Sequence, residues 1–254
     1  ASVLRRAFTE AITPPTGPVF VSFAANALDD VADQEIYPSA RPRIAFAPDE
    51  QATAEAVSIL SAAERPVMLV GDRVWQRGGG ADAVRVAELI GARVYSNGYA
   101  GVSFPTSHPQ YVSNLSLRSP AIRKALAEAD VVLAIGTRVF PEFFQISGPA
   151  LGPDTRLIHI DSNGSELGRA ERTELAILAD ARTALLALED GLINAQAGAQ
   201  LEAARMRAAT IGAETRAVRM EFARSVAESG GQRPMTPDRM MSELAAAWPS
   251  NAIM

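Results

Sequence analysis

The stretch Ala129-Asp130-Val131-Val132-Leu133-Ala134-Ile135-Gly136-Thr137-Arg138 decides the fold, together with Asp154-Thr155-Arg156-Leu157-Ile158-His159-Ile160-Asp161. Each half contains an apolar run that is too short for a typical helix and rich in β-branched residues. The first run stops at Gly136 and the second ends on Asp161. This pattern is typical of buried parallel strands whose carboxyl ends open onto a ligand crevice.

Strand and helix patterns alternate on both sides of this pair. We expect strands at Pro66–Val70, Arg93–Ser96, Asp130–Ile135, Arg156–Ile160 and Leu175–Leu178, and helices at Asp49–Ala63, Gly80–Ile90, Ser119–Ala127 and Ala181–Leu188. Such alternation predicts an α/β fold, Rossmann-like, with a parallel sheet covered by helices on both faces.

Composition excludes several classes of protein. The chain has 254 residues, is 48% hydrophobic and carries a net charge of −5, so it can bury a core and offers no basic surface for nucleic acid. It contains no cysteine, which excludes disulfides and cysteine-bound zinc and fits a cytoplasmic protein. No apolar run approaches the roughly 20 residues of a membrane span, so we expect no membrane partner.

The two ends of the chain predict pieces of further domains. Ser2–Ala11 has the pattern of a helix and Gly17–Phe23 that of a strand, which together cannot form a core. Ala195–Ser229 favours a long helix, Thr236 and Pro237 favour the start of another, and Asn251–Met254 the opening of a strand. The expected division is a domain remnant at 1–27, a linker at 28–48, a central α/β domain at 49–192, a helical linker at 193–233 and the start of a further domain at 234–254.

Polar residues and glycines at the strand ends form a candidate cofactor site. Asp161 ends one strand, where a carboxylate accepts a ribose hydroxyl hydrogen bond. Gly71 ends another, and Gly136-Thr137-Arg138 follow a third, where backbone N–H groups and an arginine hold phosphate. No Gly-x-Gly-x-x-Gly fingerprint is present. His159 lies inside a strand, so we assign it a structural place in the core and no catalytic role.

The order of these blocks resembles the thiamine diphosphate enzymes that act on 2-keto acids. Gly17–Val21 is similar to the last strand of their pyrimidine-binding domain, Pro66–Gly71 to the first strand of their central domain, and Phe104–Pro109 to the loop after the second. Ala129–Arg138 and Arg156–Asp161 match the next two strands, and Thr236–Ile253 resembles the entry to the pyrophosphate-binding domain.

Within that family, the run Phe104-Pro105-Thr106-Ser107-His108-Pro109 resembles the benzoylformate decarboxylase type. The resemblance implies that His108 projects into the active site and transfers protons during catalysis. Imidazole suits this work because it titrates near neutral pH. The alternative is a loop histidine whose nitrogens are satisfied by local backbone, and both interpretations stay open.

The resemblance also implies the cofactors. Thiamine diphosphate and Mg²⁺ belong to the family, but its catalytic glutamate and its Gly-Asp-Gly…Asn motif are expected outside this chain. Relatives of the acetohydroxyacid synthase type carry FAD on the central domain. FAD or ADP is disfavoured here, because Val139–Phe144 replaces the charged residues that follow Gly-x-Arg in those relatives.

We therefore expect an inactive fragment of a decarboxylase that acts on a small 2-keto acid. The complete protein is expected to be a homodimer or homotetramer, since such enzymes build each active site between two chains. Two alternatives stay open. One is an acetolactate synthase-like carboligase with FAD, and the other is a nucleotide-binding or scaffold module without catalysis.

Overall fold

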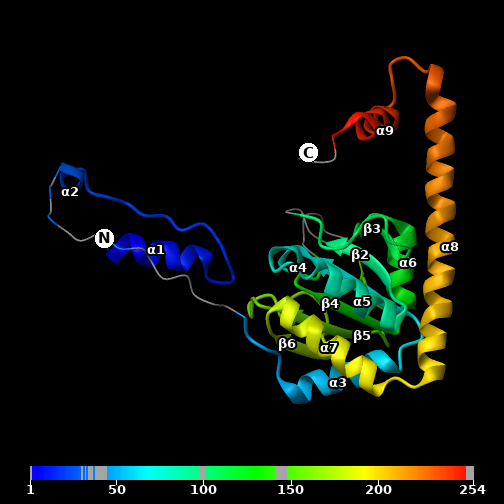
Figure 1. Ribbon diagram of the computed structural model, residues 1–254, viewed down its shortest axis with the longest axis horizontal. Coiled ribbons are helices and arrows are strands. Elements are labelled where there is room, and N and C mark those ends of the chain that lie inside the picture. The colour runs from blue at the N-terminus through cyan, green and yellow to red at the C-terminus, as the bar shows by residue number, and fades with distance from the viewer. Residues whose placement is uncertain are drawn as a thin grey trace.

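A computed structural model describes residues 2–29, 31, 33, 37, 45–97, 101–140 and 148–249. A parallel six-stranded sheet in the order β3-β2-β1-β4-β5-β6 forms its centre (Figure 1). The strands are β1 Pro66–Gly71, β2 Arg93–Asn97, β3 Tyr111–Asn114, β4 Val131–Ile135, β5 Arg156–Asp161 and β6 Leu175–Leu178. The expected α/β class with a parallel sheet is confirmed.

Helices cover both faces of this sheet (Figure 1). One face packs on α3 (Glu50–Ser61), α5 (Gly80–Ile90) and α7 (Ala181–Ala195), through buried strand residues such as Val70 and Ile135. The other face packs on α6 (Pro120–Glu128) through Leu69, Val132 and their neighbours. Alternate residues of a strand point to opposite faces, so β1 and β4 are buried on both sides and read as continuous apolar runs.

Side-chain caps fix several helix starts. Asp49 accepts a hydrogen bond from the Ala52 N–H (2.8 Å), as expected for the first residue of that helix pattern. Ser119 caps α6, and Thr236 accepts from the Arg239 N–H (3.3 Å) at the start of α9 (Pro237–Ala247). These caps satisfy N–H groups that have no partner inside the helix.

The long helix expected over Ala195–Ser229 is confirmed as α8 (Gly198–Glu228). The preceding helix, α7, is longer than expected and continues to Ala195, and Gln196 and Ala197 separate the two. A short 3₁₀ turn, η1 (Ser229–Gly231), follows α8. The first half of α8 packs on the end of α5 through Ala204, and its C-terminal part extends beyond the sheet (Figure 1).

The strand expected over Gly17–Phe23 is wrong. This segment has no regular secondary structure and lies between α1 (Ser2–Ile12) and α2 (Ala25–Asp29), because no described strand lies beside it to complete a ladder. Sequence reasoning also missed the short β3 and α4 (Asp72–Gln76). The strand expected at Asn251–Met254 lies outside the described residues.

Among the described helices, none combines the length and the apolar character needed to cross a lipid bilayer. The division into domain pieces stays a prediction.

Candidate functional site

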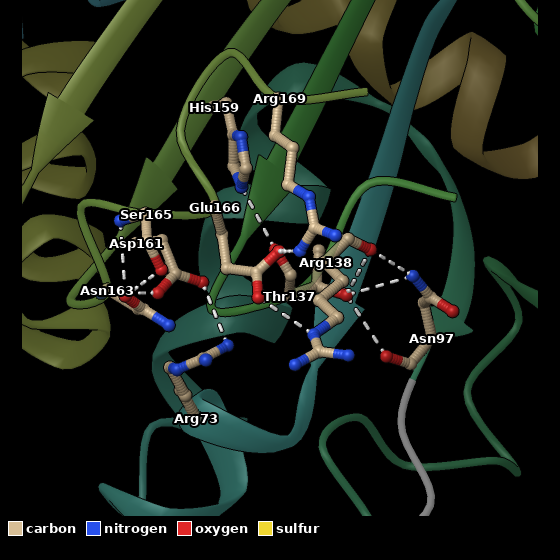
Figure 2. Close-up of polar contacts among 10 residues, drawn as sticks. All are labelled: Arg73, Asn97, Thr137, Arg138, His159, Asp161, Asn163, Ser165, Glu166 and Arg169. Carbon is tan, nitrogen blue, oxygen red and sulfur yellow. Dashed lines mark hydrogen bonds and ion pairs between the residues drawn. The ribbon is translucent and has the colours of Figure 1, made fainter. Parts of the chain in front are cut away.

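The carboxyl ends of β1, β2, β4 and β5 bring a cluster of polar side chains together, which we call the strand-end cluster (Figure 2). Its members are Arg73, Asn97, Thr137, Arg138, Asp161, Asn163, Glu166 and Arg169. Three of them, Thr137, Arg138 and Asp161, are cofactor-binding candidates predicted from the sequence. Gly71 and Gly136, the other two candidates, lie at the ends of the same strands.

Asp161 is the buried centre of one half of this cluster. Its side chain is 0% exposed, Oδ2 pairs with Arg73 Nη1 at 3.1 Å, and Oδ1 accepts from the Asn163 N–H at 2.7 Å. Burial raises the pKa of Asp161 to about 6, while Arg73 and the backbone N–H groups of Asn163 and Ser162 act to lower it. Both carboxyl oxygens are therefore engaged within the chain.

Glu166 is the buried centre of the other half. It pairs with Arg138 at 2.9 Å and with Arg169 at 3.6 Å, and the two arginine side chains are 60% and 64% exposed. Arg138, which we expected to hold phosphate, thus already has an acidic partner. A ligand phosphate would have to compete with Glu166 for it.

The glycines at these strand ends allow the neighbouring strands to approach each other closely. A Cβ on Gly71 would collide with Thr137, and one on Gly136, whose φ is +59°, would lie 2.9 Å from the Val74 backbone N. The Arg73 N–H also donates to the Gly136 carbonyl at 3.1 Å. The absence of side chains at these two glycines therefore lets the ends of β1 and β4 approach each other closely.

His159 supports the cluster from inside the sheet. Its ring is buried and Nε2 donates to the Thr137 carbonyl at 2.9 Å, which places the proton of the neutral ring on Nε2. Burial is the largest cause of its lowered pKa, so the neutral form is favoured. The hydroxyl of Thr137 in turn donates to the Asn97 carbonyl at 3.0 Å.

His108 lies apart from the strand-end cluster. It precedes β3, whose first residue Tyr111 pairs with Val94 near the amino end of β2. The structure therefore places His108 at the amino ends of the strands and does not bring it to Asp161 or Arg138. Its catalytic role and the five cofactor-binding assignments stay predictions.

The contacts of His108 define its tautomer. Nδ1 accepts from the Gln110 N–H at 3.2 Å, so the neutral ring carries its proton on Nε2, which faces Glu88 Oε1 at 3.2 Å. Phe104 packs edge-on against the ring with centroids 5.2 Å apart, and the side chain is 15% exposed. The ring is thus oriented, and its proton-bearing nitrogen points to an exposed carboxylate.

The helix α8 holds the loop that carries His108. Arg219 donates to the carbonyls of Thr106 (2.8 Å), Ser107 (3.1 Å), His108 (3.3 Å) and Tyr111 (3.3 Å). The Thr215 hydroxyl donates to the Pro109 carbonyl at 2.7 Å. One guanidinium therefore bonds three loop carbonyls and the first carbonyl of β3.

Several members of this arrangement were missed in the sequence. Arg73 and Asn97 follow or end strands, so their position at a carboxyl end was a usable signal. Arg219 carried none, because its partners are distant in the chain, and Glu166 was missed because its pairing with Arg138 depends on the packing of two strand-end loops. In the described residues, no group of three or more His, Asp, Glu or Cys side chains is arranged to hold a metal ion.

Comparison with known proteins identifies the family. The family model "Thiamine pyrophosphate enzyme, central domain" matches residues 53–188, more than half of the chain. The chain belongs to the thiamine pyrophosphate enzymes. The matched segment begins inside α3 and ends inside α7, so it contains the whole parallel sheet.

Relatives among the thiamine pyrophosphate enzymes are named for different activities. A probable acetolactate synthase large subunit of Methanocaldococcus jannaschii is 29% identical over 200 residues, covering 74% of this chain and 33% of the relative. A sulfoacetaldehyde acetyltransferase of Rhodobacter capsulatus is 35% identical over 165 residues, covering 63% of this chain and 27% of the relative.

A solved structure is similar over the same share of this chain. The thiamine diphosphate-dependent 4-hydroxybenzoylformate decarboxylase of Rhodococcus jostii RHA1 aligns with a TM-score of 0.63 and 30% identity, covering 74% of this chain and 36% of that one. The chain spans about a third of the length of the relatives it matches.

Proposed function

We propose that this chain is the central part of a thiamine diphosphate-dependent decarboxylase that acts on a small 2-keto acid, of the benzoylformate decarboxylase type. The match of the central-domain family to residues 53–188 carries this proposal. The 30% identity to a 4-hydroxybenzoylformate decarboxylase supports the substrate class. When bound, thiamine diphosphate supplies the electron sink for loss of CO₂. The catalytic glutamate and the Mg²⁺ ligands are expected in parts of the protein outside this chain.

In this function His108 holds and moves a proton at Nε2. Gln110 fixes the ring through Nδ1. Among the described residues, Glu88 is the only partner of Nε2, so it is the contact that a reacting group would replace. Glu88 is 58% exposed, so it can move away without leaving a buried charge unpaired. Arg219 and Thr215 keep the loop in place while this happens.

The second candidate is an acetolactate synthase-like carboligase with FAD. The similarity to acetolactate synthase large subunits favours it. The strand-end cluster opposes it, because Asp161 and Arg138 are already paired within the chain. A nucleotide-binding or scaffold module without catalysis is the remaining alternative.

The test uses the full-length gene product with thiamine diphosphate and Mg²⁺. Benzoylformate and pyruvate are supplied, and CO₂, acetolactate and bound flavin are measured. We expect CO₂ release without acetolactate or flavin, and no activity from the 254-residue chain alone. Acetolactate formation with a bound flavin would establish the second candidate, and absence of any turnover would support the scaffold role.

The residue that carries the chemistry is tested in the same protein. We expect His108→Ala to lower kcat by about 100-fold, the typical contribution of a general acid or base. Ser107→Ala is the matched control, because Ser107 is an exposed neighbour in the same loop. Equal kcat values for His108→Ala and the wild type would leave the histidine with a structural role only.

A further inference from the structure

A pocket of about 590 Å³ lies at the amino ends of β1 and β2, between α6 and α8. This volume is in the range of small-molecule sites, which is roughly 300–1,000 Å³. The pocket is at the opposite ends of the strands from the strand-end cluster. Its walls come from five elements, β1, β2, β3, α6 and α8, and include Val67, Tyr95, Ile122, Ala125 and Ile211. The surface offered to a ligand is therefore mostly apolar.

Most charged groups around this pocket already have partners. Arg65 donates to the Glu128 carbonyl at 2.7 Å and lies 3.7 Å from Glu64. Arg93 pairs with Glu214 at 2.6 Å, and Lys124 lies 3.8 Å from Glu128. These cations therefore add little net attraction for an incoming anion.

Arg207 is the exception among the described residues that line the pocket. Its Nη2 donates to the Ile90 carbonyl at 2.9 Å, but its buried Nε has no hydrogen-bond partner and the guanidinium makes no ion pair. Burial lowers the pKa of Arg207, and the more distant Asp130 and Glu64 only partly oppose this effect. A partly buried cation without a counterion is costly, so an anion placed here would be stabilised.

Tyr95 provides a second polar group at the apolar wall. The residue is 2% exposed, and Arg93 and Glu214 lie close enough to act on its hydroxyl electrostatically. Arg207 and Tyr95 thus both line a mainly apolar pocket. Glu64 and Glu128 at the rim disfavour a dianion, because two carboxylates would repel it.

We propose that this pocket binds a small monocarboxylate with an apolar body, with the carboxylate on Arg207 and the body against Val67, Ile122 and Ile211. Guanidinium and carboxylate match in geometry, and an Arg–carboxylate bond is stronger than a neutral hydrogen bond. The site is separate from the proposed reaction, and its test does not depend on turnover.

The probe is benzoate, titrated into the isotope-labelled 254-residue chain and followed by NMR. We expect saturable shifts at Tyr95, Val112, Ala125 and Ile211. Benzamide, which has the same body without the charge, should bind about tenfold or more weakly, the usual effect of losing one charge-assisted bond. Inorganic phosphate should produce no saturable shifts at these residues.

Variants distinguish the loss of the Arg207 charge from a loss of folding. Arg207→Gln should weaken benzoate by about tenfold or more and leave benzamide unchanged. Arg205→Gln is the matched control, since Arg205 is on the same helix, exposed, paired with Glu202 and not part of the pocket. If Arg207→Gln does not fold, Ala125→Leu, which fills the pocket, should have the same effect on benzoate.

Three results would overturn the proposal. They are equal affinity of the wild type for benzoate and benzamide, unchanged benzoate affinity in the folded variants, or shifts centred on Arg73 and Arg138. The third result would place the anion at the strand-end cluster instead.

Discussion

Burial of the Asp161 carboxyl group makes the stability of the fold depend on pH. An ordinary ion-paired carboxylate has a lowered pKa and loses its contribution as the pH falls. The pKa of Asp161 is instead raised from 3.8 to about 6, mainly by burial. Between these values the folded chain holds a proton that the unfolded chain has lost. This group therefore makes the free energy of unfolding fall as the pH rises through that window.

Asp161→Asn tests this dependence. Relative to the variant, the wild type should lose about 2–3 kcal/mol of its free energy of unfolding between pH 4 and pH 7, measured by urea denaturation at each pH. Asp154→Asn, on the exposed turn before β5, is the control and should follow the wild type. Parallel curves for the wild type and Asp161→Asn would contradict the assignment.

Residue-level prediction succeeded where position along a strand was enough. Thr137, Arg138 and Asp161 were expected at strand ends, and the structure places them there. Their partners were not predictable, because Arg73 and Asp161 are 88 positions apart and meet only through sheet order and side-chain direction. The pair between the buried Glu166 and Arg138 arises in the same way, whereas Arg169 is a neighbour three positions along the chain.

At the scale of elements, the contact between α5 and α8 depends on Gly91. This residue ends α5 with φ +63°, and a Cβ there would lie 2.9 Å from the Ala204 Cα on α8. Gly78 has a similar φ of +67° but open space around it. Both glycines thus have a backbone conformation that would strain any other residue, and they differ in the packing around them.

Gly91→Ala and Gly78→Ala separate these two costs. Gly78→Ala should lower the free energy of unfolding by about 1 kcal/mol, the cost of a left-handed non-glycine residue. Gly91→Ala should cost about 1–3 kcal/mol more, because α8 must shift. Thermal and urea denaturation measure both values. Equal costs would show that α8 yields without strain.

Arg219 is the residue through which α8 holds the His108 loop. Arg219→Gln removes a guanidinium that bonds three loop carbonyls and the first carbonyl of β3. We expect amide hydrogen exchange at His108 and Tyr111 to rise about tenfold, as the loss of a charge-assisted bond predicts. Arg224→Gln, which removes a solvent-exposed pair with Glu221 on the same helix, should change neither amide. Unchanged exchange in Arg219→Gln would show that Thr215 and local turns hold the loop alone.

Element prediction was good for helices with caps and for buried strands. Asp49 and Thr236 predicted the starts of their helices, because short polar side chains cap the free N–H groups of the first turn. The edge strand β3 was missed, since it has four residues and is only partly buried, which leaves no clear periodicity. The strand predicted over Gly17–Phe23 was wrong for a different reason. Its composition is typical of a strand, but no described strand lies beside it to pair with.

At the scale of the whole molecule, the α/β unit carries the packed core, and the described parts of the terminal segments contain no buried residue. The helices α1, α2 and α9 contain no buried residues. Side chains such as Phe8, Leu28 and Met240 remain exposed. In contrast, α8 buries Ala204 and Ile211 against the unit, and Arg207 bonds the last carbonyl of α5.

This distribution predicts that residues 45–231 fold independently. Removing 1–44 and 232–254 should move Tm by less than about 2 °C, because no described residue of either segment is buried. For a chain of this size 1 kcal/mol corresponds to about 2–4 °C. Residues 45–197, which lack α8, are the control, and their Tm should fall clearly since Ala204 no longer covers the end of α5. A fall of more than about 4 °C in 45–231 would mean that the termini supply more than about 1 kcal/mol. The two terminal segments would then have to be counted as part of the folded unit.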